Sequence, residues 1–147
     1  MNILVSHCFL GEPCRYDGTS RLDRQIIELH RAGHNLVPVC PEVLGGLEVP
    51  REPAELQPDG RVLTRDGRDV TEAYRAGAER ALEIARENGC TVAILKARSP
   101  SCGCGEVYDG TFTGSVTSGW GVAARLLADN GIEVMDEEHL QASLYSL

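Results

Sequence analysis

The feature of this 147-residue chain that most limits its fold is the alternation of short apolar runs with amphipathic helical segments. The apolar runs have the length of strands and lie at residues 2–6, 35–39, 91–95 and 132–135. Periodic apolar spacing and capping residues predict helices over residues 22–33, 71–88, 119–131 and 136–145. Strands that alternate with helices form a parallel sheet on which the helices pack. The sequence therefore predicts one α/β domain over residues 1–147, with a mostly parallel sheet and a ligand site at the carboxyl ends of its strands.

Two segments interrupt this alternation. Residues 41–70 are rich in proline, glycine and charge, and DGRVLTRDGRDV within them is typical of a small hairpin. Residues 103–118 are rich in glycine and threonine, and they predict either a long loop or a short hairpin. Loops of this length in a compact domain are often functional.

Charge and the first residues exclude several classes of function. Lysine and arginine number 14 against 22 aspartates and glutamates, so the formal net charge is −8. Because an acidic chain repels phosphate polyanions, we expect no nucleic-acid partner. The segment MNILVSHCFLGEP has no basic region before a short apolar run, so we expect neither a signal peptide nor a membrane span. We therefore expect a cytoplasmic protein that acts on a small molecule, as a monomer or a homodimer.

The chain has six cysteines, and three of them follow predicted strands. In a reducing compartment such cysteines are ligands, reactive thiols or core residues rather than disulfides. Cys8, Cys40 and Cys102 each lie just past the end of an apolar run. Because parallel strands end at one edge of the sheet, we expect these thiols to meet there. Thiolates select zinc, copper(I) or iron–sulfur clusters, and the absence of a CxxC motif argues against a zinc ribbon or a ferredoxin-type cluster.

The other three cysteines have less regular positions. A single buried cysteine usually packs as a small apolar residue, and Cys90, which precedes its strand at the opposite edge, is predicted to be structural. Cys14 and Cys104 lie in turns near candidate ligands. Each is a fourth ligand, a thiol beside the site or neither. Three thiolates on a cubane leave one iron free as a Lewis acid, whereas a fourth would favour a structural or electron-transfer cluster.

Polar residues near the same edge supply candidate chemistry. Glu42 follows the second cysteine of the trio and is either a general base for water or a surface acid. Ser99 and Ser101 flank a proline beside the third cysteine, where they either bind a ligand or cap a turn. Arg15 and Asp17 belong to a segment whose Asp-Gly pair is first of all a turn signal. The backbone N–H groups of TSGWG, before a predicted helix, are a further candidate for binding an anion or a carbonyl oxygen.

Four segments of the chain resemble one protein family, in order and over nearly the whole length. They are VSHCFLGEPCRYDG, PVCPEVLGGLEVPREPAE, GRDVTEAYRAGAE and ILKARSPSCGCGEVYDGTFTG. Together they are similar to the small bacterial and archaeal family typified by 2-thiouracil desulfidase. The resemblance implies a [4Fe-4S] cluster on Cys8, Cys40 and Cys102, whose free iron takes the thione sulfur of the substrate. Water then replaces sulfur at the ring carbon, giving uracil and hydrogen sulfide without net redox change.

The resemblance also implies roles for the polar residues. Glu42 would be the acid and base, Ser101 or less favourably Ser99 would contact the substrate, and Arg15 and Asp17 would shape the pocket. The chain departs from the family pattern at the extra cysteines 14 and 104, which leave open a fourth protein ligand. The alternatives are an iron–sulfur redox or cluster-binding protein without hydrolytic chemistry, a zinc-thiolate enzyme, and a thiol-rich binding domain without metal.

Overall fold

The computed structural model describes residues 1–145 and has a parallel four-stranded sheet at its centre. The sheet has the order β2-β1-β5-β8, with strands β1 (Asn2–Ser6), β2 (Asn35–Val39), β5 (Val92–Leu95) and β8 (Glu133–Asp136). The predicted α/β class and parallel sheet are confirmed. Pro38 lies on β2, which is an edge strand and, within the part of the chain that the structure describes, pairs only with β1. A residue without an N–H is tolerated on an edge strand because one side of that strand forms no hydrogen bonds with a neighbour.

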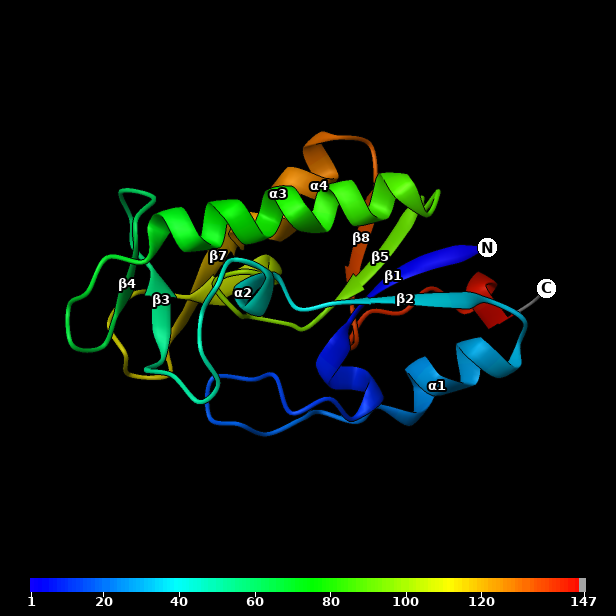
Figure 1. Cartoon of the computed structure of the whole chain (residues 1–147), viewed down its shortest axis with the longest axis horizontal. Coiled ribbons are helices and arrows are strands. Elements are labelled where there is room, and N and C mark those ends of the chain that lie inside the picture. Colours follow the sequence, from blue (N-terminus) through cyan, green and yellow to red (C-terminus); the bar gives the residue numbers. More distant parts are fainter. Residues whose placement is uncertain (146–147) are drawn as a thin grey trace.

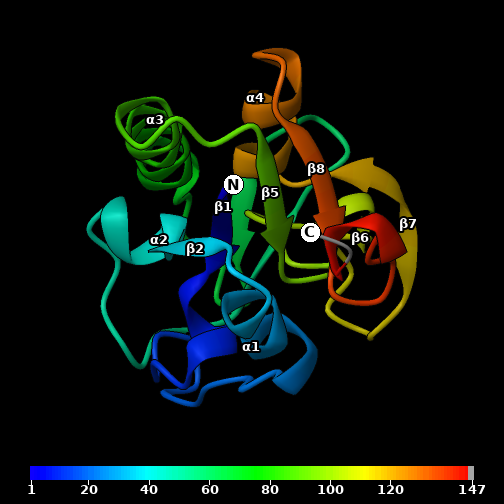
Figure 2. The same cartoon turned by 90° about the vertical axis from the view of Figure 1, so that its right-hand side faces the viewer.

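Helices cover both faces of the sheet. They are the α-helices α1 (Arg24–Arg31), α2 (Pro41–Leu44), α3 (Thr71–Glu87) and α4 (Val122–Asp129), and the 3-10 helices η1 (His7–Leu10) and η2 (Ala142–Tyr145). Figures 1 and 2 show α3 and α4 on one side of the sheet and α1 on the other. Among the described residues, no helix combines the length and apolar character that crossing a membrane requires.

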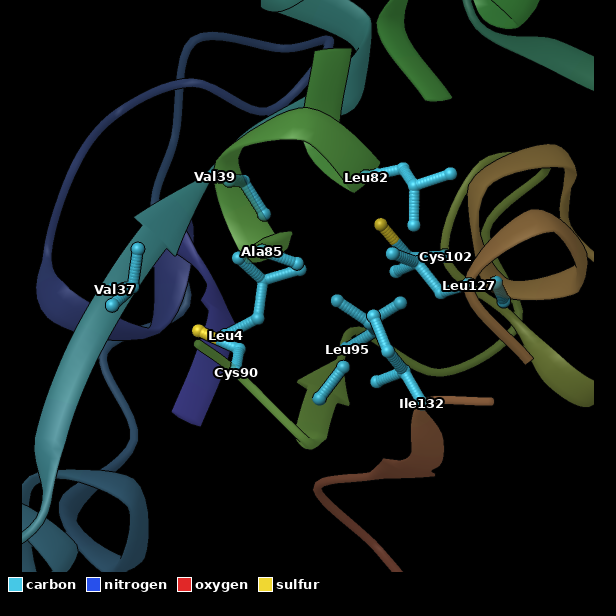
Figure 3. Packing of buried hydrophobic residues seen from close by; sticks show 12 residues of the cluster. Leu4, Val37, Val39, Leu82, Ala85, Cys90, Leu95, Cys102, Leu127 and Ile132 are labelled. Carbon is cyan, nitrogen blue, oxygen red and sulfur yellow. The ribbon is translucent and has the colours of Figure 1, made fainter. Parts of the chain in front are cut away.

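Two hydrophobic cores result, because successive residues of a strand point to opposite faces. On one face, Leu4 packs with Leu82 of α3 and Leu127 of α4 (Figure 3). On the other, Ile3 packs with Ile26 and the rest of the buried face of α1. The central strands β1 and β5 are buried on both faces, which explains their uninterrupted apolar runs.

Two antiparallel hairpins account for the irregular segments. The first joins β3 (Ala54–Leu56) and β4 (Val62–Thr64), and the second joins β6 (Cys104–Tyr108) and β7 (Val116–Trp120). The sequence predicts a hairpin within residues 59–70, but the observed hairpin begins before them, because its first strand is β3 at Ala54–Leu56. Residues 103–118 adopt the hairpin rather than the long loop, and β3 contacts β6.

Two predicted helices are shorter than their apolar spacing indicated. The helix predicted over 22–33 begins at Arg24, because the carboxylate of Asp23 accepts a hydrogen bond from the N–H of Gln25 at 2.9 Å and caps the helix there. The helix predicted over 119–131 begins at Val122, because residues 116–120 pair in the β6–β7 hairpin.

The helix predicted over residues 136–145 is wrong. The strand β8 extends to Asp136, turns follow it, and only a 3-10 helix forms near the end of the described chain. The Asp136 carboxylate accepts hydrogen bonds from the N–H of Glu138 at 2.9 Å and from Nδ1 of His139 at 2.8 Å. These local bonds stabilise the turn that follows β8.

Candidate active site

A cavity of about 320 Å³ lies at the carboxyl ends of the sheet strands. Ser6 lines it at the end of β1, Val39 at the end of β2, and Lys96 directly after β5. Residues of the two hairpins also line the cavity, among them Phe112 in the loop between β6 and β7. The cavity therefore lies at the edge of the sheet where the sequence predicted a ligand site.

Four thiols line this cavity, and they reach it from both hydrophobic cores. They belong to Cys8, Cys14, Cys40 and Cys102. Cys102 packs in the core under α3 and α4 (Figure 3), whereas Cys8 and Cys14 pack in the core on the α1 side, with Cys40 against it. The three cysteines that the sequence singled out thus meet around one space, and Cys14 joins them.

The remaining cysteines lie elsewhere. Cys90 is buried in the core near the start of β5 and does not line the cavity. The thiol of Cys104 is 3.7 Å from Oδ2 of Asp136, and Cys104 also does not line the cavity. Cys14, by contrast, lines the cavity, and its carbonyl oxygen accepts a hydrogen bond from the thiol of Cys40 at 3.8 Å. Of the two extra thiols, it is Cys14 that is placed to interact with whatever the trio binds.

Burial keeps the thiols of Cys102 and Cys40 protonated in the absence of a ligand. Complete burial, with the charges of Glu42 and Cys40 nearby, raises the pKa of Cys102 to about 12. The contact with Cys14 and burial also raise the pKa of Cys40 far above its usual value. A group that binds thiolates must therefore displace protons from a site with little water, as a soft metal or cluster does.

The turn that carries Cys102 is fixed by two serine hydroxyls. Oγ of Ser99 accepts a hydrogen bond from the N–H of Cys102 at 2.7 Å. Oγ of Ser6, at the end of β1, accepts one from the N–H of Lys96 at 2.9 Å and lies 3.8 Å from Sγ of Cys102. Strand β1 thereby orients a thiol that belongs to a distant part of the chain.

The start of α4 holds the same turn through its backbone. The N–H groups of Val122 and Ala123 donate to the carbonyl oxygens of Pro100 and Ser101, both at 2.9 Å. A Cβ on Gly121 would lie 2.5 Å from the carbonyl of Ser101, so this close approach requires glycine. Within TSGWG, which the sequence offered as an anion site, the N–H of Gly121 donates to the carbonyl oxygen of Gly103 at 2.7 Å, and residues 117–120 pair with β6, so the chain itself engages this segment.

Glu42 is held at the cavity by two buried residues. Its Oε1 accepts a hydrogen bond of 2.6 Å from the hydroxyl of Tyr74, and lies 3.3 Å from Nε and 3.2 Å from Nη2 of Arg51. The side chain of Arg51 is only 7% exposed. Burial and the neighbouring Glu42 charge raise the pKa of Tyr74 well above its usual range, so Tyr74 acts as a donor. All these contacts fall on Oε1, and within residues 1–145 no hydrogen bond reaches Oε2.

Arg51 connects Glu42 to the loop that carries Cys14. Its Nη2 donates to the carbonyl oxygen of Cys14 at 3.1 Å, and its Nη1 donates to that of Glu48 at 2.9 Å. One guanidinium thus fixes the carboxylate and the backbone beside a thiol.

Two glycines bring the helix that carries Glu42 against α3. A Cβ on Gly77 would lie 1.7 Å from the carbonyl oxygen of Pro41, and one on Gly45 would lie 1.9 Å from that of Ala73. Backbone therefore meets backbone where α2 crosses α3. This contact explains a glycine inside a helix, and it places Glu42 within reach of Tyr74.

Comparisons with known proteins identify the family. A family model described as 2-thiouracil desulfurase matches residues 3–139. The chain belongs to the 2-thiouracil desulfurase family. The protein YbbK of Bacillus subtilis (strain 168), described as uncharacterized, is 42% identical over 150 residues, which cover 94% of this chain and 97% of YbbK. The solved structure of TudS, a [4Fe-4S]-dependent thiouracil desulfidase, has a TM-score of 0.87 and 43% identity, covering 95% of this chain and 92% of TudS. The family resemblance predicted from the sequence is confirmed.

In this member of the desulfurase family, six of the eight residues predicted for the site line the cavity. They are Cys8, Cys40, Cys102, Glu42, Ser99 and Arg15. Asp17 is exposed and its carboxylate accepts the N–H of Thr19 at 3.0 Å; hydrogen bonds from Thr19 lower the pKa of Asp17. Ser101 is fully buried outside the cavity lining, and its hydroxyl has no hydrogen-bond partner among residues 1–145.

Sequence reasoning missed Arg51, Tyr74 and Ser6. Arg51 follows Pro50 in a segment that the family resemblance includes. The resemblance therefore pointed to this segment, but it assigned no function to Arg51. In the sequence, Tyr74 occupies a position on the apolar face of a predicted helix, so nothing distinguished it from a core residue. Ser6 is a polar residue at the end of an otherwise apolar buried strand, which is the sequence signal that was available.

Proposed function

We propose that this protein removes sulfur from a small thiolated heterocycle, most directly 2-thiouracil, with a [4Fe-4S] cluster held by Cys8, Cys40 and Cys102. The observation that carries this proposal is the meeting of these thiols with Glu42 around one cavity. Membership of the 2-thiouracil desulfurase family supports the reaction. The similarity to TudS, a [4Fe-4S]-dependent thiouracil desulfidase, supports the cofactor.

The donor set fits a cluster better than a single ion. Within residues 1–145, no three histidine, cysteine, aspartate or glutamate side chains are arranged to hold one metal ion. The thiols instead surround a cavity, and soft thiolates suit an iron–sulfur cluster. The zinc-thiolate alternative requires sulfurs that close tightly around one point, about 2.3 Å from it. When bound on three thiolates, the cluster supplies a Lewis-acidic iron for the thione sulfur.

The reaction needs a residue that moves protons, and Glu42 is placed to do so. Its Oε1 is held by Tyr74 and Arg51, Oε2 has no hydrogen-bond partner among residues 1–145, and the residue lines the cavity, which supports a role as a base. Glu42 accepts a proton as water adds to the ring carbon, and returns it as the C–S bond breaks. Thiouracil and water then give uracil and hydrogen sulfide, and no electrons are gained or lost overall.

Two cations offset the negative charge that thiolates bring to this site. Arg51 lies against Glu42 and Cys14. Lys96 lines the cavity, and its Nζ is 2.8 Å from Oε2 of Glu137. Both ion pairs are largely shielded from water, where uncompensated charge is costly. We propose that Arg15 and Ser99, at the cavity, contact the substrate, and that Asp17 and Ser101 support the turns beside them.

The size of the cavity agrees with a small substrate. Ligand pockets in proteins span roughly 300–1,000 Å³, and this cavity is near the lower end at about 320 Å³. Because the cluster must share this cavity, we expect a substrate no larger than a single heterocycle. We expect the reaction to take place in the cytoplasm and without nucleic acid, and the choice between monomer and homodimer stays open.

Anaerobic purification followed by an assay tests this function. We expect a brown protein with about four irons per chain, which releases sulfide from 2-thiouracil in equal amount to uracil. A colourless zinc protein would contradict the cofactor. An intact cluster that releases no sulfide would instead favour the iron–sulfur redox alternative.

A further inference from the structure

Phe112 is an aromatic side chain at the cavity for which the reaction described so far has no use. It lies in the loop between β6 and β7, is partly buried, and lines the same cavity as the four thiols. An aromatic ring in this small cavity offers a flat apolar surface beside the thiols and Glu42. The expected substrate is itself a flat ring.

A buried carboxylate fixes the loop that carries this ring. Glu55 of β3 is only 8% exposed, and its Oε1 accepts hydrogen bonds from the N–H groups of Gly110 at 2.9 Å and Phe112 at 3.1 Å. The side-chain amide of Gln57 donates to the carbonyl oxygen of Gly110 at 3.3 Å. One hairpin therefore holds the tip of the other through a charged group taken almost completely out of water.

The backbone at Phe112 is unusual for a bulky residue. Its φ is 59°, in the left-handed region that large side chains rarely adopt. The bond to Glu55 compensates for this conformation, and strain of this kind gathers at functional sites. The guanidinium of Arg65 lies over the ring, 5.9 Å from its centre, which further fixes the ring at the cavity.

We propose that Phe112 stacks on the planar ring of the substrate and that Glu55 is the residue that positions it. This inference rests on the proposed function and names the part of the substrate that the site recognises, a flat conjugated heterocycle. Stacking on an aromatic side chain depends on the flat face of a heterocycle and not on which heterocycle it is. It strengthens substrate binding and takes no part in bond breaking. It therefore selects for planarity in the substrate and leaves the chemistry to the residues around Glu42.

The test replaces the ring by an apolar side chain without a π face. For Phe112→Leu we expect KM for 2-thiouracil to rise about tenfold, with kcat within twofold and iron content unchanged. The parent should prefer 2-thiouracil over its 5,6-dihydro derivative, which has the same thione but is not flat, and the variant should lose that preference. Isothermal titration with uracil gives a readout without turnover, and the affinity should fall in parallel.

The controls separate stacking from damage to the fold. Phe112→Tyr keeps a ring and should retain the preference for the flat substrate that Phe112→Leu loses, and Val116→Ala, at an exposed position of the same hairpin, should change nothing. Glu55→Ala should reproduce the effect of Phe112→Leu, and the double variant should be no worse, because Glu55 acts through Phe112. An unchanged KM, substrate preference and uracil affinity in Phe112→Leu would overturn this inference. Absence of sulfide release by the parent would instead overturn the proposed function.

Discussion

Each of the three strand-end cysteines is an ordinary buried residue when taken alone, and only their shared cavity distinguishes them from Cys90. We expect Cys8→Ser, Cys40→Ser and Cys102→Ser each to lose most of the bound iron, since a cubane on two thiolates is weakly held. Cys90→Ser should keep it, because Cys90 packs in the core outside the cavity. Iron and sulfide analysis with absorption spectra of anaerobic preparations measures this. A reversed pattern would mean that other thiols hold the cluster.

Cys14 decides whether the cluster keeps an open iron. It lines the same cavity as Cys8, Cys40 and Cys102, so it is a candidate for a fourth ligand. For Cys14→Ala we expect unchanged iron content and at least half of the sulfide release, because three thiolates suffice for the proposed chemistry. Iron analysis and the turnover assay check this. Loss of the cluster in this variant would identify Cys14 as a ligand and favour the non-catalytic alternative.

Glu42 is the residue whose charge the proposed reaction needs. For Glu42→Gln we expect retained cluster and a fall in kcat of about 100-fold or more, the usual contribution of a general base. The amide still accepts the Tyr74 hydroxyl, but Arg51 loses its counter-charge, which costs up to about 3–5 kcal/mol in a buried pair. Turnover and denaturant unfolding measure the two effects separately.

The matched control is Glu48→Gln, which makes the same chemical change nearby. Glu48 is exposed and offers Arg51 only its backbone carbonyl, so both activity and stability should stay near those of the parent. A near-normal rate in Glu42→Gln would show that another group moves the proton.

At the scale of elements, the crossing of α2 over α3 places the carboxylate of Glu42. Helix propensity alone predicts that Gly77→Ala stabilises α3 by about 1 kcal/mol. The Cβ would, however, meet the carbonyl oxygen of Pro41 at 1.7 Å, so the two helices must separate. We expect a net loss of about 1–3 kcal/mol of unfolding free energy, as for an overpacked core, together with reduced turnover.

Denaturant unfolding and the sulfide assay measure this pair of effects. Glu79→Ala, on the exposed face of the same helix, serves as the control and should change neither by much. Greater stability in Gly77→Ala would mean that α2 can move away without cost.

At the scale of the whole molecule, the cluster would tie together segments that are far apart in the chain. The thiols come from both hydrophobic cores and from the ends of β1, β2 and β5. A group that binds only the folded state stabilises it, so the cluster-loaded protein should melt at a clearly higher temperature than the cluster-free protein. Anaerobic thermal unfolding of both forms measures this difference, which Cys40→Ser should abolish and Cys90→Ser should preserve. Equal melting temperatures in the parent would contradict a cluster bridging these segments.

The sequence by itself determined the class of the fold and the edge at which the site lies. Strand and helix periods are local properties of a chain, and parallel strands share one edge for topological reasons. That is why Cys8, Cys40 and Cys102 could be chosen without coordinates.

Only the tertiary structure decided which turn residues meet the cavity and which partners hold them. The family resemblance ranked Ser101 ahead of Ser99 for contact with the substrate, yet Ser99 lines the cavity and Ser101 is fully buried outside its lining, in the turn that α4 holds. Arg51 and Tyr74 reach Glu42 through the packing of α2 on α3. Such contacts depend on how distant elements pack and on where loop side chains point, and no local period in the sequence encodes either.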